Sequence, residues 1–210
     1  MIARLPLLLL AAGALAGAQL PPAAPAPAPP APPPGPPPTL VTLVTDQGPV
    51  VIALDSSKAP VTSANFLRYV DQHRFDGSSF YRAVKVAPGY GLVQGGVRNA
   101  PKKVLPPIRH EPTSTTGLTH KDGTISMARA APGTASGDFF IVIGDIPSMD
   151  ADPSKPGDNQ GFAAFGQVVQ GMDLMRHLLD APVSADGPAG MKGEMLAQPV
   201  KILSARRGGG

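Results

Sequence analysis

Residues 123–141 read GTISMARAAPGTASGDFFI, and this stretch says more about the fold than any other part of the chain. It holds one β-rich run, Thr124–Ala128, and the start of a second, Phe139–Ile143, joined by a segment of small residues and one proline. Short apolar runs bounded by Gly, Pro and Asp are typical of strands. The stretch therefore predicts two strands connected by a loop.

Further runs of the same kind lie on both sides of it. Val41–Thr45 and Val50–Leu54 flank the turn signal Asp46-Gln47-Gly48 and predict a hairpin. Apolar residues at helical spacing predict helices over Pro60–Val70 and Asp173–Leu179. The other predicted strands are Phe80–Val86, Leu92–Gln94, Ala163–Val169 and Val200–Ala205. Seven or eight short strands with two helices indicate a closed antiparallel barrel or a sandwich, and strands at both ends of the domain favour the barrel.

The first residues follow the pattern of a secretory signal. A positive Met1–Arg4 precedes an apolar run, Leu5–Ala16, and Ala16-Gly17-Ala18 supplies small residues for cleavage. We expect residues 1–18 to be a signal peptide and Gln19 to begin the mature chain. The alternative is an uncleaved anchor, although the apolar run is shorter than the ~20 residues of a typical span.

Composition divides the rest of the chain. Residues 19–38 are almost wholly Pro and Ala, which predicts an extended, polyproline-like linker. Residues 39–207 are long enough for one domain, and residues 208–210 form a glycine tail that we expect to be disordered. There is no Cys, so packing alone must stabilise the domain. The net charge is +3 with Lys and Arg scattered, which argues against a nucleic-acid partner.

Three more motifs accompany the first stretch: FDGSSFYR at 75–82, VQGG at 93–96 and FGQVVQGMD at 165–173. Together, in this order and over nearly the whole domain, they resemble the cyclophilin family of peptidyl-prolyl cis-trans isomerases. The resemblance implies an eight-stranded closed antiparallel barrel capped by two helices, with a substrate groove on its outer face. It also implies no cofactor and no covalent intermediate.

The resemblance further implies two catalytic residues. The Arg82 guanidinium would stabilise the twisted amide more strongly than either planar form, and Gln94 would orient the substrate carbonyl. The implied groove is lined by Phe80, Met127, Ala128, Arg129, Asp138, Phe140 and Phe162.

Several positions depart from the family pattern. Asp138 stands where the family has Gln, Arg129 where it has Asn, and Phe162 where it has a groove His. Asp138 could pair with Arg129 and leave Arg82 free, or it could pair with Arg82 itself. Because one new acid and one new base occur together, we expect the pairing with Arg129. Twelve positions separate Arg82 from Gln94, which predicts a longer connection between their strands.

Other kinds of site find little support. The acidic residues of the Pro-rich stretch lack the spacing of a Ca²⁺ loop. The histidines show no metal-ligand pairing, and no serine lies in a recognisable nucleophile motif. The acidic residues are Asp145, Asp150, Asp152 and Asp158, and the histidines are His73, His110, His120 and His177.

The function we expect is isomerisation of X–Pro bonds in exported or unfolded polypeptides. The protein would be a periplasmic or secreted monomer without membrane contact beyond the signal peptide. One alternative is a module on the same barrel that binds proline segments with weak or no turnover. Another is a structural envelope protein, and only the linker supports this alternative.

Overall fold

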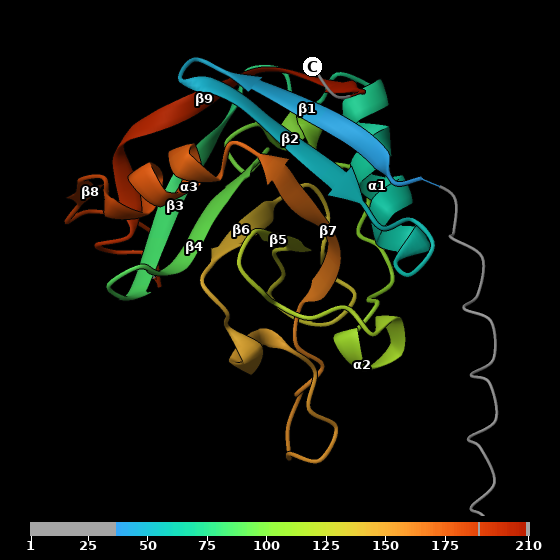
Figure 1. Cartoon of the computed structure of the whole chain (residues 1–210). Coiled ribbons are helices and arrows are strands. Elements are labelled where there is room, and N and C mark those ends of the chain that lie inside the picture. The colour runs from blue at the N-terminus through green and yellow to red at the C-terminus, as the bar shows by residue number, and fades with distance from the viewer. Residues whose placement is uncertain (1–36, 189, 209–210) are drawn as a thin grey trace, which may run out of the picture. The chain divides into compact units, whose positions relative to one another are not determined.

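The predicted hairpin at the start of the domain consists of β1 (Thr39–Thr45) and β2 (Gly48–Leu54), which pair along their whole length (Figure 1). The computed structural model describes residues 37–188 and 190–208. Gly48 adopts a φ of 121°, a conformation that favours glycine, and this allows the tight turn between the two strands.

The described residues include little of the predicted terminal segments. The predicted signal peptide and all of the linker before Pro37 lie outside them, as do residues 209 and 210 of the predicted tail. Gly208 is held in place, because its N–H donates to the Leu40 carbonyl and its own carbonyl accepts from the Thr42 hydroxyl.

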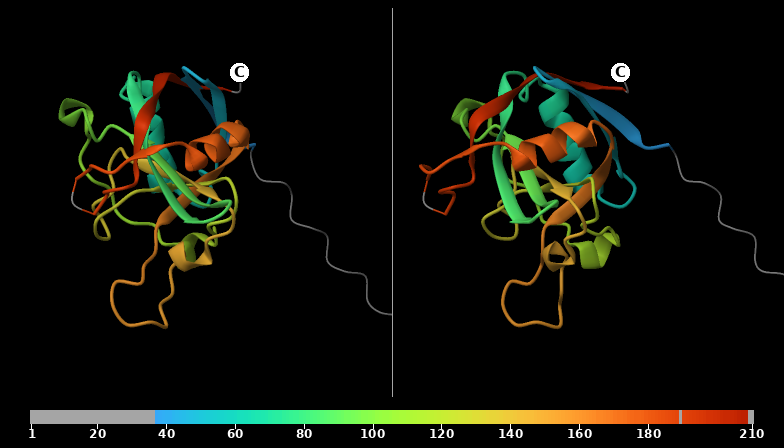
Figure 2. Two further views of the ribbon diagram at one scale, coloured as in Figure 1. Left: turned by 90° about the vertical axis from the view of Figure 1, so that its left-hand side faces the viewer. Right: turned by 60° about the vertical axis from the view of Figure 1, so that its left-hand side comes forward.

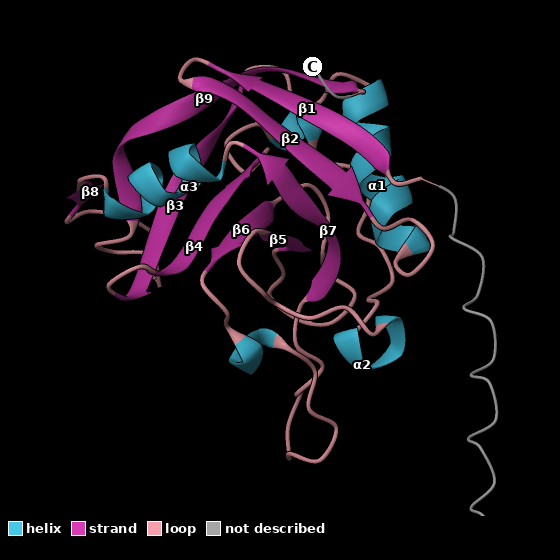
Figure 3. Cartoon of the chain, in the orientation of Figure 1, coloured by secondary structure: helices cyan, strands magenta, loops and turns pink. Residues whose placement is uncertain are grey.

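One antiparallel sheet contains all nine strands of the described chain, in the order β1-β2-β7-β5-β6-β4-β3-β9-β8. Because β1 also pairs with β9, eight strands close into a barrel, and β8 is added beside β9 (Figure 3). The predicted barrel is confirmed, with one short additional strand. The remaining strands are β3 (Ser78–Ala87), β4 (Tyr90–Gly96), β5 (Thr124–Met127), β6 (Phe139–Ile143), β7 (Ala163–Gln170), β8 (Val183–Ser184) and β9 (Met195–Arg207).

The two predicted helices are α1 (Pro60–Asp71) and α3 (Met172–Asp180), and both pack against the strands (Figure 2). Pro60 stands in the first turn of α1, where a missing N–H costs no hydrogen bond. The structure adds a single helical turn, α2 (Thr113–Thr116), and two 3₁₀ turns, Pro101–Lys103 and Pro147–Met149. Among the described helices, none has the length and apolarity that crossing a bilayer would need.

Side chains fill the inside of the barrel. Phe66 from α1 meets Phe139 and Phe165 there, with ring centroids 5.5 and 5.3 Å apart. Within the part of the chain that the structure describes, thirty buried apolar residues belong to this interior core, as expected of an eight-stranded barrel whose interior is filled by side chains. Successive strand residues point to opposite faces, so a ligand site must be built from the outward-facing positions.

Candidate functional site

Arg82 reaches the outer face of the barrel because strand β3 contains a bulge. Phe80 of β3 pairs with Gly95 of β4, and Arg82 pairs with Gln94. Tyr81, which lies between them, therefore has no partner of its own on β4. Residues i and i+2 of a regular strand point to the same face, and one extra residue reverses this alternation. Phe80 therefore points inward, whereas the Arg82 side chain points outward.

Two side chains hold the Arg82 guanidinium. Its Nε and Nη2 donate to Oε2 of Glu194 at 2.8 and 2.5 Å, and its Nη1 donates to Oε1 of Gln94 at 2.8 Å. A guanidinium has five N–H donors, so two remain for a bound ligand. The Arg82 side chain is 20% exposed, which makes it accessible but shields it partly from water.

Gln94 is itself fixed by a second hydrogen bond. The residue is 5% exposed, and its Nε2 donates to the Tyr81 hydroxyl at 2.8 Å. Burial raises the pKa of Tyr81, so the hydroxyl stays protonated at neutral pH. With its Nε2 bonded to Tyr81, Gln94 can present only its oxygen to Arg82.

The site lies on a row of paired residues that crosses four strands. Arg82 of β3 pairs with Gln94 of β4, Gln94 with Phe140 of β6, and Phe140 with Ser126 of β5. Residues in such a row point to the same face of a sheet. Arg82, Gln94 and Phe140 are therefore neighbours on the outer face.

An apolar surface adjoins Arg82 and Gln94. Leu92, Phe140 and Val142 form a buried group, here named the outer cluster, that is separate from the interior core. The Phe162 ring meets Phe140 edge-on, with centroids 5.3 Å apart. Val84, Ala128, Ile146, Met149 and Phe162 pack against the outer cluster. A fixed cation beside an apolar surface suits a ligand in which an amide is joined to a compact apolar ring.

Three polar residues, His120, Asp150 and Ser126, support the Phe140 ring from behind. His120 stacks on the Phe140 ring, its Nδ1 lies 2.6 Å from Oδ1 of Asp150, and its Nε2 lies 3.0 Å from the Ser126 hydroxyl. A carboxylate only accepts, so Nδ1 is assigned the proton and Ser126 donates to Nε2. Burial lowers the pKa of His120. Because Ser126 is 0% exposed, this arrangement positions Phe140 and offers no nucleophile to a substrate.

Two predicted groove residues lie elsewhere. Phe80 and Met127 are both buried in the interior core, where Phe80 packs on Phe139 at 5.8 Å. Strand alternation explains Met127, because its neighbour Ser126 points outward, and the bulge at Tyr81 explains Phe80. Their assignment as groove walls is corrected here: they belong to the barrel interior.

The expected pairing of Arg129 with Asp138 is wrong. Arg129 donates to the Asp158 carboxylate at 2.7 and 3.1 Å, and its guanidinium lies 5.2 Å from the centre of the Phe162 ring. Asp138 instead accepts from the backbone N–H of Arg98 at 3.0 Å, and burial raises its pKa. The long Arg129 side chain reaches the loop before β7, whereas Asp138 turns towards the residues that follow β4.

Ala128 and Phe162, which were both predicted to line the groove, pack against the outer cluster. The Ala128 N–H already donates to the Asp138 carbonyl at 2.9 Å, so it is not available to a ligand. Phe162 lies between Phe140 and the Arg129 guanidinium, which fixes its ring from two sides.

Sequence reasoning missed Leu92 and Glu194. Leu92 could have been found, because it lies two residues before Gln94 on one strand and so shares its face. Glu194 could not, because it is 112 positions from Arg82 and reaches it only through the pairing of β3 with β9.

The acidic residues of the Pro-rich stretch are bonded to protein groups. Asp150 binds His120, Asp158 binds Arg129, and Asp152 binds Lys155. Asp145 accepts from a backbone N–H. Across residues 37–188 and 190–208, no three His, Asp or Glu side chains gather as a metal site would require.

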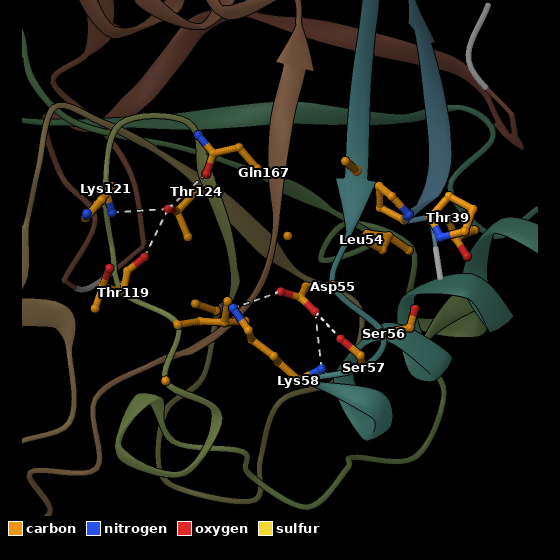
Figure 4. A pocket seen from close by; sticks show the side chains of 17 residues that line it. Thr39, Leu54, Asp55, Ser56, Ser57, Lys58, Thr119, Lys121, Thr124 and Gln167 are labelled. Atoms are coloured by element: carbon orange, nitrogen blue, oxygen red, sulfur yellow. Dashed lines mark hydrogen bonds and ion pairs between the residues drawn. The ribbon is translucent and has the colours of Figure 1, made fainter. Parts of the chain in front are cut away.

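A hollow of about 710 Å³ lies on another part of the barrel, between the β2–α1 connection, the residues after α2, and β7 (Figure 4). Leu54, Asp55 and Lys58 line one side of it, and Thr119 and Gln167 line the other. None of the residues around Arg82 belongs to its lining, so the size of this hollow does not mark it as the reaction site.

Comparisons with known proteins point to one family. Residues 40–207 match the family model described as cyclophilin type peptidyl-prolyl cis-trans isomerase/CLD. A peptidyl-prolyl cis-trans isomerase of Acinetobacter baylyi is 33% identical over 80% of this chain and 85% of its own length. Peptidyl-prolyl cis-trans isomerase A of Dickeya dadantii is 34% identical over 80% of this chain and 84% of its own. The solved cyclophilin-type isomerase of Cryptosporidium parvum shares the fold, with a TM-score of 0.62 at 18% identity, over 82% of this chain and 98% of that one.

Proposed function

Since this chain belongs to the cyclophilin-type peptidyl-prolyl cis-trans isomerase family and is such an isomerase, we propose that Arg82 is its catalytic donor and the outer cluster its proline pocket. The observation that carries this proposal is the shared outward row of Arg82, Gln94 and Phe140. It sets a fixed guanidinium with two unused N–H groups beside an apolar surface.

The reaction requires from the protein mainly electrostatic stabilisation of the twisted amide. Amide resonance imposes a barrier of ~18–20 kcal/mol on rotation of a peptide bond, and uncatalysed X–Pro exchange takes tens to hundreds of seconds. In the twisted amide the prolyl nitrogen becomes a hydrogen-bond acceptor, because its lone pair is no longer shared with the carbonyl. Donation from Arg82 to this nitrogen lowers the energy of the twisted form and of neither planar form. No bond to the enzyme forms or breaks.

The other residues position the substrate. Phe140, supported by His120 from behind and Phe162 at its edge, receives the proline ring. Gln94, with its oxygen held towards Arg82, orients the amide near the guanidinium. Phe80 and Met127 act only as core residues of the barrel.

The substrates are proline-containing polypeptides. A structure of the Cryptosporidium parvum relative was determined in the presence of the dipeptide Ala-Pro. All groups proposed here for this chain come from one barrel, which supports action as a monomer. The scattered charges support the absence of a nucleic-acid partner.

The isomerase acts outside the cytoplasm, in the periplasm or as a secreted protein. This part of the proposal rests on the signal pattern of residues 1–18. Residues 19–38 then serve as a linker ahead of the barrel, and no membrane contact is needed beyond the signal peptide.

Replacing Arg82 tests the catalytic assignment. Arg82→Ala should lower kcat/KM by about 10²–10³-fold, the effect of losing a preorganised donor to developing charge. The measurement is a protease-coupled assay on a proline tetrapeptide, with circular dichroism to confirm folding.

Arg176→Ala is the matched control, because Arg176 pairs with Asp122 on the surface and lies outside the proposed groove. Its activity should equal that of the unmodified chain. A folded Arg82→Ala variant with full activity would contradict the assignment. An unmodified chain that binds the peptide without turning it over would favour a binding module instead.

A further inference from the structure

Glu194 is the one acidic side chain in the described residues that bonds to Arg82. Both hydrogen bonds end on a single oxygen, Oε2, at 2.8 Å from Nε and 2.5 Å from Nη2. Together with the bond from Nη1 to Gln94, they hold the guanidinium on two sides. The two N–H groups that remain are those proposed above to serve the substrate.

A tight turn of the backbone places Glu194 beside Arg82. The Glu194 N–H donates to the Met191 carbonyl at 3.2 Å, and Gly193 between them adopts a φ of 75°. That conformation favours glycine at this point of a turn. The Glu194 carbonyl then accepts from the N–H of Ala83 at 2.8 Å, which ties it to the residue that follows Arg82. The carboxylate is therefore held beside the guanidinium by the main chain.

Burial makes this contact stronger than an ordinary surface ion pair. The Arg82 side chain is 20% exposed and that of Glu194 is 30% exposed. By comparison, the side chains of the Lys85–Asp180 pair, which also begins on β3, are 48% and 62% exposed. Exposed pairs contribute little because water screens them and both side chains stay mobile. The Arg82–Glu194 pair is thus better shielded from water than the Lys85–Asp180 pair.

We propose that Glu194 is a positioning residue for catalysis: its carboxylate fixes the Arg82 guanidinium so that the remaining N–H groups face the prolyl nitrogen. Without it, the long Arg82 side chain would have to be ordered during each turnover, which slows the reaction. This inference rests on the proposed role of Arg82 and adds to it a residue from the segment that precedes β9.

The test compares kcat/KM of five variants in the protease-coupled assay. Glu194→Ala should lower kcat/KM about 10-fold, whereas Glu194→Gln, which keeps an acceptor oxygen, should stay within about threefold of the unmodified chain. Asp180→Ala is the matched control for loss of an ion pair on β3 and should have no effect. Arg82→Ala alone and combined with Glu194→Ala complete a double-mutant cycle.

The double-mutant cycle distinguishes a Glu194 that positions Arg82 from a Glu194 that only stabilises the fold. If Glu194 acts through Arg82, the double variant should be no slower than Arg82→Ala, because there is no guanidinium left to position. A further 10-fold loss in the double variant would overturn the proposal, as would Glu194→Ala at full activity or Glu194→Gln as slow as Glu194→Ala. Full activity of Arg82→Ala would instead contradict the catalytic assignment itself. Thermal melts of each variant confirm that the rates refer to folded protein.

Discussion

At the scale of single residues, His120 links protonation to the groove. The imidazole lies between Asp150 and Ser126 and stacks on Phe140. Burial lowers its pKa from the ordinary value of 6.5, with Asp150 acting in the opposite sense. In the unfolded chain the same histidine binds a proton more readily. The folded protein therefore loses stability as the pH falls below about 6.5.

This effect can be measured through His120→Gln. Between pH 7 and pH 5, urea denaturation should show the free energy of unfolding of the unmodified protein falling more steeply than that of the variant. His177→Gln, on the exposed face of α3, is the control for replacing a surface histidine. Equal slopes for all three proteins would show that His120 does not titrate differently on folding.

At the scale of elements, each strand of the barrel serves two purposes. On β4, Leu92 belongs to the outer cluster, whereas Val93 beside it is buried in the interior core. Pleating sends these neighbours to opposite faces, so one strand supports both the proposed proline pocket and the packing of the barrel. KM should therefore respond to the outward residue Leu92 and not to the inward residue Val93, whereas both are buried and both should affect stability.

Two substitutions on β4 test this division. Leu92→Ala should raise KM about tenfold by removing apolar contact from the pocket. Val93→Ala should leave KM unchanged and lower the free energy of unfolding by about 2 kcal/mol, because it leaves a cavity in the core. Peptide kinetics and chemical denaturation of both variants provide the comparison. A rise in KM for Val93→Ala would show that the two faces are not independent.

At the scale of the whole molecule, the described strands close the barrel among themselves. All eight closing strands lie between Thr39 and Arg207, and β1 pairs with β9 to complete the circle. Removal of residues 1–18 therefore leaves every described strand and every residue of the proposed site in place. Cleavage of a signal peptide is compatible with an intact fold.

Intact-mass measurement of the protein purified from its native source tests the proposed export. We expect a mature chain that begins at Gln19 and has full isomerase activity, since the barrel and the groove are complete without the residues removed. A protein produced without residues 1–18 provides the reference for both mass and rate. A native mass that still includes residues 1–18 would contradict cleavage and favour the anchored form.

Much of the candidate site could be predicted from motifs. Arg82, Gln94, Phe140 and Phe162 were expected in the groove, and the structure places all four beside the outer cluster or on its row. These residues belong to segments whose local sequence resembles the family. Side-chain partners were not predictable in this way, as Arg129 shows, because its bond to Asp158 depends on the path of a loop.

By itself, the amino-acid sequence predicted the eight barrel strands and the two longer helices, because apolar periodicity and turn residues are local properties, and the family resemblance of its motifs predicted the closed barrel. Only the tertiary structure decided which face each side chain occupies and which partner it meets. The bulge at Tyr81 reverses the alternation between Phe80 and Arg82, and strand pairing brings Glu194 to Arg82 across 112 positions. Both depend on contacts between segments far apart in the chain, which no local pattern encodes.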